Sequence, residues 1–304
     1  MKEFKMDFYN PTNLKSYNLD ESMRYQLAML DSLDVFTRLH CESVANLTCR
    51  ICEYMHMKSY FTEYCTVCAY LHDIGKQFIP PAVLQKNGPL TDEEYTVMKT
   101  HTTIGYNMCM RDEKLRPYSA GPIYHHEALN GSGYPNRVAS PDLPLEGQII
   151  RVADEFDAIT SKRQYKSHIG VCDTLKILIE EAQPNKDKNE KFGKLNPKIV
   201  KALIKVVLDD TEYEIYNLFQ YVEHLQKESD RLEKIESYEQ EMHKATNDYD
   251  RDYYSNAIKK LFSVGETLEN YKQVLEEYKQ AHSYRKEQLE KLYEEFKAIK
   301  KLKV

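Results

Sequence analysis

The chain has 304 residues, which is enough for one large domain with an extension or for two domains. Charged residues make up 30%, and the formal net charge of -6 comes without a large block of Lys and Arg, so binding to duplex nucleic acid is not expected. The N-terminus has no signal-peptide-like run, and no apolar stretch reaches the roughly eighteen residues that a membrane-spanning helix needs. We therefore expect a cytoplasmic protein without membrane contact.

The N-terminal part changes character near Leu33. Residues 1–29 show little periodicity and are predicted to be a short helix or a tail, too short for a sensory domain of typical size. From Leu33 the apolar residues follow a helical stripe, made of Phe36, His40, Val44, Leu47, Ile51 and Met55. His40 is therefore expected to point inward, where a lone His is more often a hydrogen-bonded core residue than a metal ligand.

Two cysteine pairs have the spacing of zinc ligands. Cys49-x-x-Cys52 and Cys65-x-x-Cys68 match the pattern of a zinc ribbon. Both pairs lie in predicted helices without the Gly or Pro turns of zinc knuckles, so we interpret them as small, reduced core thiols. The odd total of seven cysteines also argues against a full disulfide framework.

The segment from Cys68 to Lys76 contains an adjacent His72 and Asp73. An apolar run leads into this pair, and Gly75 is predicted to end the helix directly after it. An imidazole offers one ring nitrogen to a metal, whereas a carboxylate has two oxygens that can bridge two metals. Taken alone, such a pair is more often a solvated or N-capping Asp beside a hydrogen-bonded His.

Further histidines occur at predicted helical positions. Thr91 and Glu94 form a capping-box pattern at the start of a helix on which His101 shares the inward face with Met98 and Ile104. A short helix is predicted to start at Gly121-Pro122-Ile123 and to end in His125-His126-Glu127. Neighbouring helical residues diverge by about 100°, so these two imidazoles can face different sides of one site. A buried His pair needs two separate hydrogen-bonding environments, which makes a purely structural role unfavourable.

A glycine-rich loop and another helix follow. Asn130-Gly-Ser-Gly133-Tyr134-Pro135 is either a simple turn or a loop whose backbone approaches a ligand, with Tyr134 offering an aromatic face. The helix predicted from Glu146 to Ser161 carries Asp154 and Asp157 on nearly one face, which allows Asp157 to support a ligating His or a metal-bound water. Arg163 and Lys166 are cations near the helix end, where ordinary surface charges are also common.

Together these segments resemble the HD-GYP domain family over roughly residues 30 to 210. The resemblance rests on His72-Asp-Ile-Gly-Lys76, Met98-Lys-Thr-His101, His125-His126-Glu127, Gly133-Tyr134-Pro135 and Val152-Ala-Asp154-Glu-Phe-Asp157, in that order. Residues 192–203 are similar to the final helix of the family. The family pattern usually has Asp at the position of Asn130, an exchange that keeps an acceptor and loses a charge.

The resemblance implies an all-α, HD-domain helical bundle with a metal centre. The implied metal ligands are His40, His72, Asp73, His101, His125, His126 and Asp154. The expected cofactors are two divalent metal ions, iron or manganese. Two rather than three are expected because Phe36 stands where some relatives carry a Glu that binds a third metal. The implied catalytic residues are Asp73 and Lys76. The implied substrate-binding residues are Lys76, Gly133, Tyr134, Pro135, Asp157, Arg163 and Lys166.

The activity implied by this resemblance is hydrolysis of cyclic di-GMP to pGpG and/or GMP. A metal-bridging hydroxide would attack phosphorus in line, while Lys76 and Arg163 offset the developing charge. Two alternatives remain open. The chain could be an HD phosphohydrolase for another cyclic dinucleotide or nucleotide, or a non-catalytic cyclic-dinucleotide receptor that signals through its extension.

The composition changes after residue 210. In residues 211–304 Gly265 is the only Gly or Pro, and Glu, Lys, Tyr and Leu dominate, so we expect two or three long helices with turns near Asn247 and Gly265. One apolar stripe runs from Ile215 to Ile235 and another, with steps of three and four residues, from Leu268 to Ile299. We predict a helical hairpin or coiled coil that serves as a homodimer or protein-partner interface, with a monomeric helical cap as the alternative.

Overall fold

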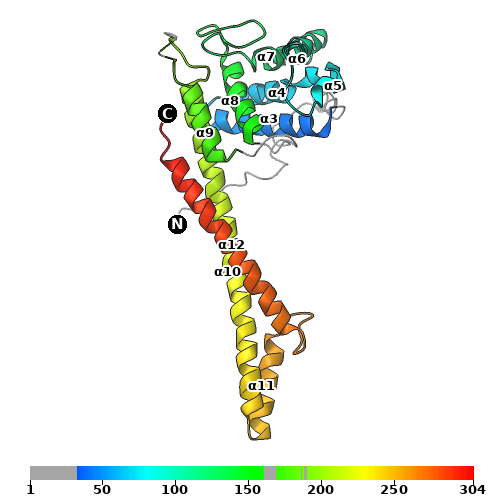
Figure 1. Cartoon of the computed structure of the whole chain (residues 1–304), viewed down its shortest axis with the longest axis vertical. Helices are drawn as coiled ribbons and strands as arrows, with labels where there is room; N and C mark the ends of the chain where they lie inside the picture. The colour runs from blue at the N-terminus through cyan, green and yellow to red at the C-terminus, as the bar shows by residue number, and fades with distance from the viewer. Residues whose placement is uncertain (1–32, 161–168, 186, 188–189) are drawn as a thin grey trace. The chain divides into compact units, whose positions relative to one another are not determined.

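The computed structural model describes residues 33–160, 169–185, 187 and 190–304. These residues are helical with no strand among them, which confirms the all-α prediction (Figure 1). The chain divides into two compact units, one of Met1–Val207 with Leu302–Val304 and one of Leu208–Lys301. The predicted N-terminal segment 1–29 and the predicted substrate contacts Arg163 and Lys166 lie outside the described residues.

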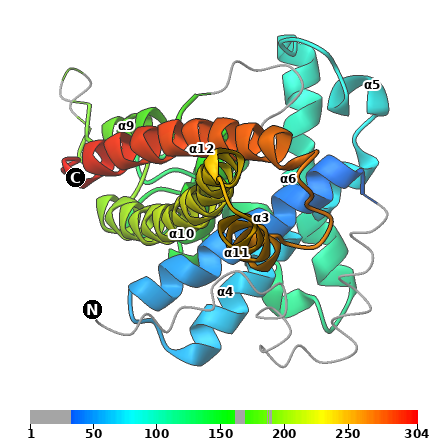
Figure 2. The ribbon, with the colours of Figure 1, turned by 90° about the horizontal axis from the view of Figure 1, so that it is seen from below.

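The first unit is a bundle of mostly short helices. In chain order they are α3 (Val35–Tyr54), α4 (Ser59–Leu71), the 3-10 helix η2 (Ile74–Phe78), α5 (Pro81–Leu84), α6 (Asp92–Arg111), the 3-10 helix η3 (Arg116–Tyr118), α7 (Ala120–Tyr124), α8 (Leu145–Thr160), α9 (Val171–Glu181) and the beginning of α10 (Pro197–Lys244). Helix α3 packs against α4 (Figure 2) and against α8. Helix α6 packs against η2 and α7. The core between them is aliphatic, with Val44, Ile51, Leu71 and Ile149 fully buried.

Side-chain caps fix where two of the long helices begin. Asp34 precedes α3, and its carboxylate accepts hydrogen bonds from the backbone N–H groups of Phe36 at 3.1 Å and Thr37 at 3.0 Å. At α6 the capping box is confirmed: Thr91 Oγ1 accepts from Glu94 N at 3.2 Å, and Glu94 Oε2 accepts from Thr91 N at 2.7 Å. These caps set the register in which His40 and His101 face the core.

The cysteine pairs occupy the core rather than a zinc knuckle. Cys49, Cys52, Cys65 and Cys68 are free and buried on α3 and α4. Burial raises the pKa of the Cys68 thiol, which keeps it in the protonated, unreactive form. The arrangement agrees with the interpretation as reduced core thiols.

Gly75 has a different role from the predicted one. Helix α4 ends at Leu71 with His72 as its C-cap, and Gly75 lies inside η2, so the prediction that Gly75 ends this helix is wrong. A Cβ atom at Gly75 would lie 2.0 Å from the carbonyl oxygen of His101. Glycine is needed because the backbone of α6 passes directly over this position.

The second unit consists of the rest of α10 with α11 (Asp248–Leu261) and α12 (Tyr271–Lys300). Leu275 belongs to a buried cluster with Leu232, whereas Leu289 packs with Ile215 and Val222. Helix α12 therefore runs antiparallel to α10, and the two predicted apolar stripes are buried against each other. The turns expected near Asn247 and Gly265 are confirmed by the ends of α10 and α11.

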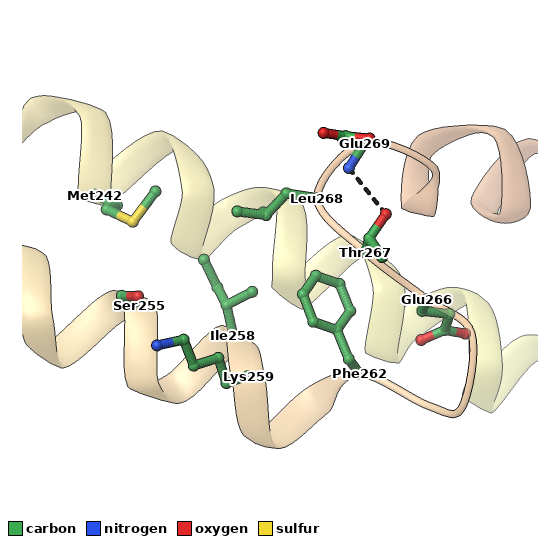
Figure 3. A pocket seen from close by; sticks show the side chains of 9 residues that line it. All are labelled: Met242, Ser255, Ile258, Lys259, Phe262, Glu266, Thr267, Leu268 and Glu269. Carbon is green, nitrogen blue, oxygen red and sulfur yellow. Dashed lines mark hydrogen bonds between the residues drawn. The ribbon is translucent and has the colours of Figure 1, made fainter.

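A cavity of about 400 Å³ lies in this second unit, between α10, α11 and the loop that leads to α12 (Figure 3). Met242, Ile258, Phe262 and Leu268 form its apolar lining, and Lys259 reaches its edge. None of the predicted metal ligands lines it. Among the helices that the structure describes, none has both the length and the apolarity of a membrane-spanning segment.

Candidate metal centre

The predicted metal ligands converge in the first unit. They come from α3 (His40), the residues directly after α4 (His72 and Asp73), α6 (His101), the residues directly after α7 (His125 and His126) and α8 (Asp154). All of them are buried except His126, whose side chain is 26% exposed. Five segments far apart in the sequence therefore deliver imidazole and carboxylate groups to one place.

These side chains form two groups joined by Asp73. The donor atoms of His40, His72 and Asp154 lie within 4.8 Å of one another, and so do those of His101, His125 and His126. Asp73 Oδ2 is 3.3 Å from His72 Nε2, whereas its Oδ1 is 3.3 Å from His101 Nε2. One carboxylate thus presents one oxygen to each group, as a bridging ligand would.

The orientation of the imidazoles is fixed by the backbone. The Nδ1 atoms of His72, His101 and His125 donate to carbonyl oxygens three residues earlier, at 2.6, 2.6 and 2.9 Å. Because Nδ1 carries the proton, the Nε2 lone pair of each neutral ring faces the cluster. Metal-binding histidines are held in this way by an outer hydrogen bond.

The donor set fits divalent cations. The Nε2 atoms of His101 and His125 lie 3.1 Å apart, and within the described chain His72 Nε2 and Asp73 Oδ1 are buried without a hydrogen-bond partner. Such unpaired buried acceptors are costly, and a cation between them removes the cost. Burial lowers the pKa of His101 and His125, which favours the neutral rings that bind metals.

The two carboxylates remain ionised despite their burial. Burial alone would raise the pKa of Asp73, but the Lys76 ammonium, which contacts Asp73 Oδ2, and the adjacent His72 hold it well below its usual range. Burial likewise opposes ionisation of Asp154, and the contact of 3.0 Å between its Oδ1 and His40 Nε2 holds its pKa low. The cluster therefore presents negative charge to a cation.

Asp157 lies behind His40, on the side away from the cluster. Its Oδ2 is 2.6 Å from His40 Nδ1, and its Oδ1 accepts a hydrogen bond from Ser43. His40 Nε2 in turn lies 3.0 Å from Asp154 Oδ1. This geometry matches the support of a ligating His; the predicted substrate contact of Asp157 stays a prediction.

The glycine-rich loop closes against the cluster. The ring of Tyr134 lies 4.6 Å from that of His126 at an interplanar angle of 31°, and Tyr134 N donates to His126 O at 3.1 Å. A Cβ atom at Gly133 would lie 2.5 Å from His126 O. Gly133 thus permits the close approach that brings Tyr134 to the metal centre, and Pro135 follows it.

Several supporting residues were not predicted. Glu127 is fully buried, and its two carboxylate oxygens accept from the backbone N–H groups of Asn136 at 2.6 Å and Val138 at 2.9 Å. Arg151 Nη1 donates to the carbonyl oxygen of His126 at 2.8 Å. The one sequence feature that could have indicated this supporting role is that Glu127 directly follows His125 and His126.

Cys41 was also not predicted near the site. Its thiol lies with His72 and Asp73 in a third group of atoms within 4.8 Å. Burial raises the pKa of Cys41 well above its usual range, so it remains a thiol there. Cys41 directly follows His40, and nothing in its sequence context distinguished it from the other cysteines.

Asn130 uses both ends of its amide. Its Oδ1 accepts from Ser132 N at 3.1 Å, and its Nδ2 donates to Glu190 Oε2 at 3.2 Å. The oxygen forms the local turn, and the nitrogen faces a carboxylate. The amide is therefore matched to Glu190, whose position in space the sequence did not reveal.

The sequence pattern of the HD domain family matches residues 24–189. The chain belongs to the HD domain family. This HD domain is 38% identical over 182 residues to the cyclic di-GMP phosphodiesterase of Thermotoga maritima, covering 59% of this chain and 47% of that protein. It is 41% identical over 97 residues, 31% of this chain and 19% of the relative, to the 3'3'-cGAMP-specific phosphodiesterase 2 of Vibrio cholerae.

A third relative is the cyclic di-GMP phosphodiesterase response regulator RpfG of Xanthomonas campestris pv. campestris. It is 45% identical over 98 residues, covering 31% of this chain and 26% of the relative. The chain thus spans less than half the length of each of these three proteins. The resemblance drawn from the sequence motifs is confirmed at the level of the family.

Proposed function

We propose that this HD domain is a metal-dependent phosphodiesterase that hydrolyses cyclic di-GMP to pGpG and/or GMP. The observation that carries the proposal is Asp73, whose two oxygens each lie 3.3 Å from a histidine of a different group. The names of the relatives from Thermotoga and Xanthomonas supply the substrate.

In this proposal two divalent cations, iron or manganese, are held by the two groups. His40, His72 and Asp154 would hold one, His101, His125 and His126 the other, and Asp73 would bind both. Bound there, the cations would lower the pKa of a water enough to supply a nucleophile near neutral pH and would polarise a phosphoryl oxygen. A mixed set of imidazoles and carboxylates suits both metals.

The residues of the chain then have distinct tasks. Lys76 neutralises Asp73 and adds positive charge beside the reacting phosphate. Asp157 accepts the Nδ1 proton of His40, which leaves the Nε2 lone pair of the neutral ring toward the cluster. Tyr134 forms the outer wall, with its ring against His126. Arg163 and Lys166 remain proposed contacts for the substrate phosphates on the basis of the sequence.

The proposal is tested by purifying the protein anaerobically, measuring its metal content and incubating the same sample with cyclic di-GMP. About two equivalents of iron or manganese per chain, with pGpG or GMP accumulating, are expected. Substitution of both His72 and Asp73 by Ala should remove metal and turnover together. Turnover retained at the wild-type rate in that variant would refute the assignment of the metal centre.

A second candidate substrate is the mixed dinucleotide 3'3'-cGAMP, because one relative is named for it. Competition between the two dinucleotides for one enzyme sample ranks their kcat/KM values. Binding of either dinucleotide without any metal-dependent product would instead favour the receptor alternative.

The proposed domain boundaries follow the sequence. Residues 30–210 would form the phosphohydrolase domain and residues 211–304 an extension that binds a second copy or another protein. Exposed aromatic side chains on α10 and α12, namely Tyr216, Phe219, Tyr221, Tyr284 and Tyr293, support this role. Light scattering of the full chain over a range of concentrations measures its oligomeric state.

A further inference from the structure

A series of aromatic rings leads from the metal centre to the protein surface. The ring centroids of His125 and His126 lie 4.1 Å apart, those of His126 and Tyr134 4.6 Å, and those of Tyr134 and Tyr95 6.3 Å. Tyr95 lies on α6 and is 46% exposed. It is the outer end of the series.

A cation lies on the same side of α6. Lys99 is one helical turn after Tyr95, and its ammonium is 4.9 Å from the centroid of the Tyr95 ring. In the part of the chain that the structure describes, Lys99 forms no ion pair, and the hydroxyl groups of Tyr95 and Tyr134 form no hydrogen bond within the protein. Tyr95, Tyr134 and Lys99, which we call the rim, thus offer an aromatic face, two hydroxyl groups and a positive charge.

We propose that Tyr95 and Lys99, together with Tyr134, form a subsite for one nucleobase of the cyclic dinucleotide and its flanking phosphate. The inference rests on the proposed function. The rings of Tyr134 and Tyr95 follow His126 at centroid distances of 4.6 and 6.3 Å. With the scissile phosphate at the metal centre, a neighbouring base would be received on the Tyr95 ring.

The chemistry of the rim matches such a ligand. Bases stack on exposed aromatic side chains, and this contact contributes substantially to the binding of nucleotides that are not paired in a duplex. Lys99 attracts the phosphate that lies opposite the scissile one. An exposed tyrosine by itself would be ordinary surface, but Tyr95 contacts the ring that packs on the candidate metal ligand His126.

The test compares Tyr95→Ala, Tyr95→Phe and Lys99→Gln with the wild type in the full metal-loaded chain. Tyr60→Ala is the matched control, because Tyr60 is a 69% exposed tyrosine on α4 outside the ring series. For cyclic di-GMP, Tyr95→Ala should raise KM by roughly tenfold or more, with kcat and metal content close to wild type. Tyr60→Ala should behave like the wild type, and Tyr95→Phe, which keeps the aromatic face, should raise KM much less than Tyr95→Ala does. Lys99→Gln should raise KM at low salt and less at high salt.

An unchanged KM in Tyr95→Ala, or a loss of kcat alone, would overturn the subsite. If the wild type does not hydrolyse cyclic di-GMP, the proposed function fails, and the same variants are compared by calorimetric titration with cyclic di-GMP. A dissociation constant at least tenfold weaker for Tyr95→Ala would then support the subsite. Equal dissociation constants, or no binding by the wild type, would overturn it.

Discussion

Asp157 and His40 are joined by a contact of 2.6 Å between Oδ2 and Nδ1, on the side of the imidazole that faces away from the candidate metal centre. Asp157→Ala removes this contact, so His40 loses its fixed tautomer. Such outer partners typically affect metal affinity by about 10- to 100-fold. We expect a weakening of that size for metal binding and for turnover, measured by titration of the metal-free protein. The control is Asp173→Ala on α9, an exposed carboxylate that forms an ion pair with Lys176.

Removal of the metals should lower the stability of the first unit. The unpaired Nε2 of His72 and Oδ1 of Asp73, and the 3.1 Å approach of two imidazole nitrogens, are left uncompensated without cations. Chelation should therefore lower the melting temperature, and added Mn²⁺ should restore it and raise it further with the logarithm of the Mn²⁺ concentration. A melting temperature that does not respond to either would contradict the fit of the donor set to cations.

Glu127→Gln should loosen the loop that carries Tyr134. The glutamine keeps one acceptor but turns its NH₂ group toward the N–H of Asn136 or Val138, so one backbone donor is left without a partner. A lost hydrogen bond to a charged group costs about 1.5–3 kcal/mol. Faster hydrogen exchange at Asn136 and Val138 is the expected signature. Glu113→Gln, at an exposed position on the connection after α6, should leave both amides unchanged.

Asn130→Asp tests the departure from the family pattern. The aspartate still accepts from Ser132, so the turn should persist, but its second oxygen now faces Glu190. We expect a loss of stability of about 1 kcal/mol or less, because both groups are partly solvated. The double variant Asn130→Asp with Glu190→Gln should recover it. If the double variant does not recover the lost stability, repulsion from Glu190 is not the cause of that loss.

In the second unit, Arg231→Met should free the loop before α12. Arg231 donates to both carboxylate oxygens of Glu266 at 2.6 Å and to the carbonyl oxygen of Leu261 at 2.7 Å. Hydrogen exchange of residues 262–270 should accelerate while the first unit is unaffected.

The stability contributed by the Arg231–Glu266 interaction should depend on pH. The hydrogen bond from Arg231 lowers the pKa of Glu266 in the folded protein. The contribution is therefore present above the unfolded pKa of about 4.3 and is lost as the pH falls from there through the lower folded pKa.

The elements that the sequence predicted well have short-range causes. The stripe through His40, the capping box at Thr91 and the apolar stripes of α10 and α12 depend on spacings of three and four residues, which a single chain displays directly. The candidate metal ligands were predicted from the resemblance to a family whose motifs occur in the same order along the chain. No spacing in the sequence by itself reveals that His40 and Asp154 meet.

What the sequence did not reveal depends on contacts between distant segments. The sequence predicts a helix end at Gly75 because glycine often occupies that position, whereas glycine is required there because the α6 backbone passes over it. The partner of Asn130 is 60 residues away. The role of Glu127 depends on the path of a loop that returns to it, and Cys41 lies near Asp73 only because α3 packs on α4.

The carbonyl contacts of His72, His101 and His125 each span three residues, within a helix or directly at its end. Each ring is therefore held by its own segment, and its side-chain entropy is already lost when the bundle has formed. A cation entering the cluster then finds these three rings already ordered. Binding should therefore be limited by shedding of the hydration shell of the ion rather than by rearrangement of the protein.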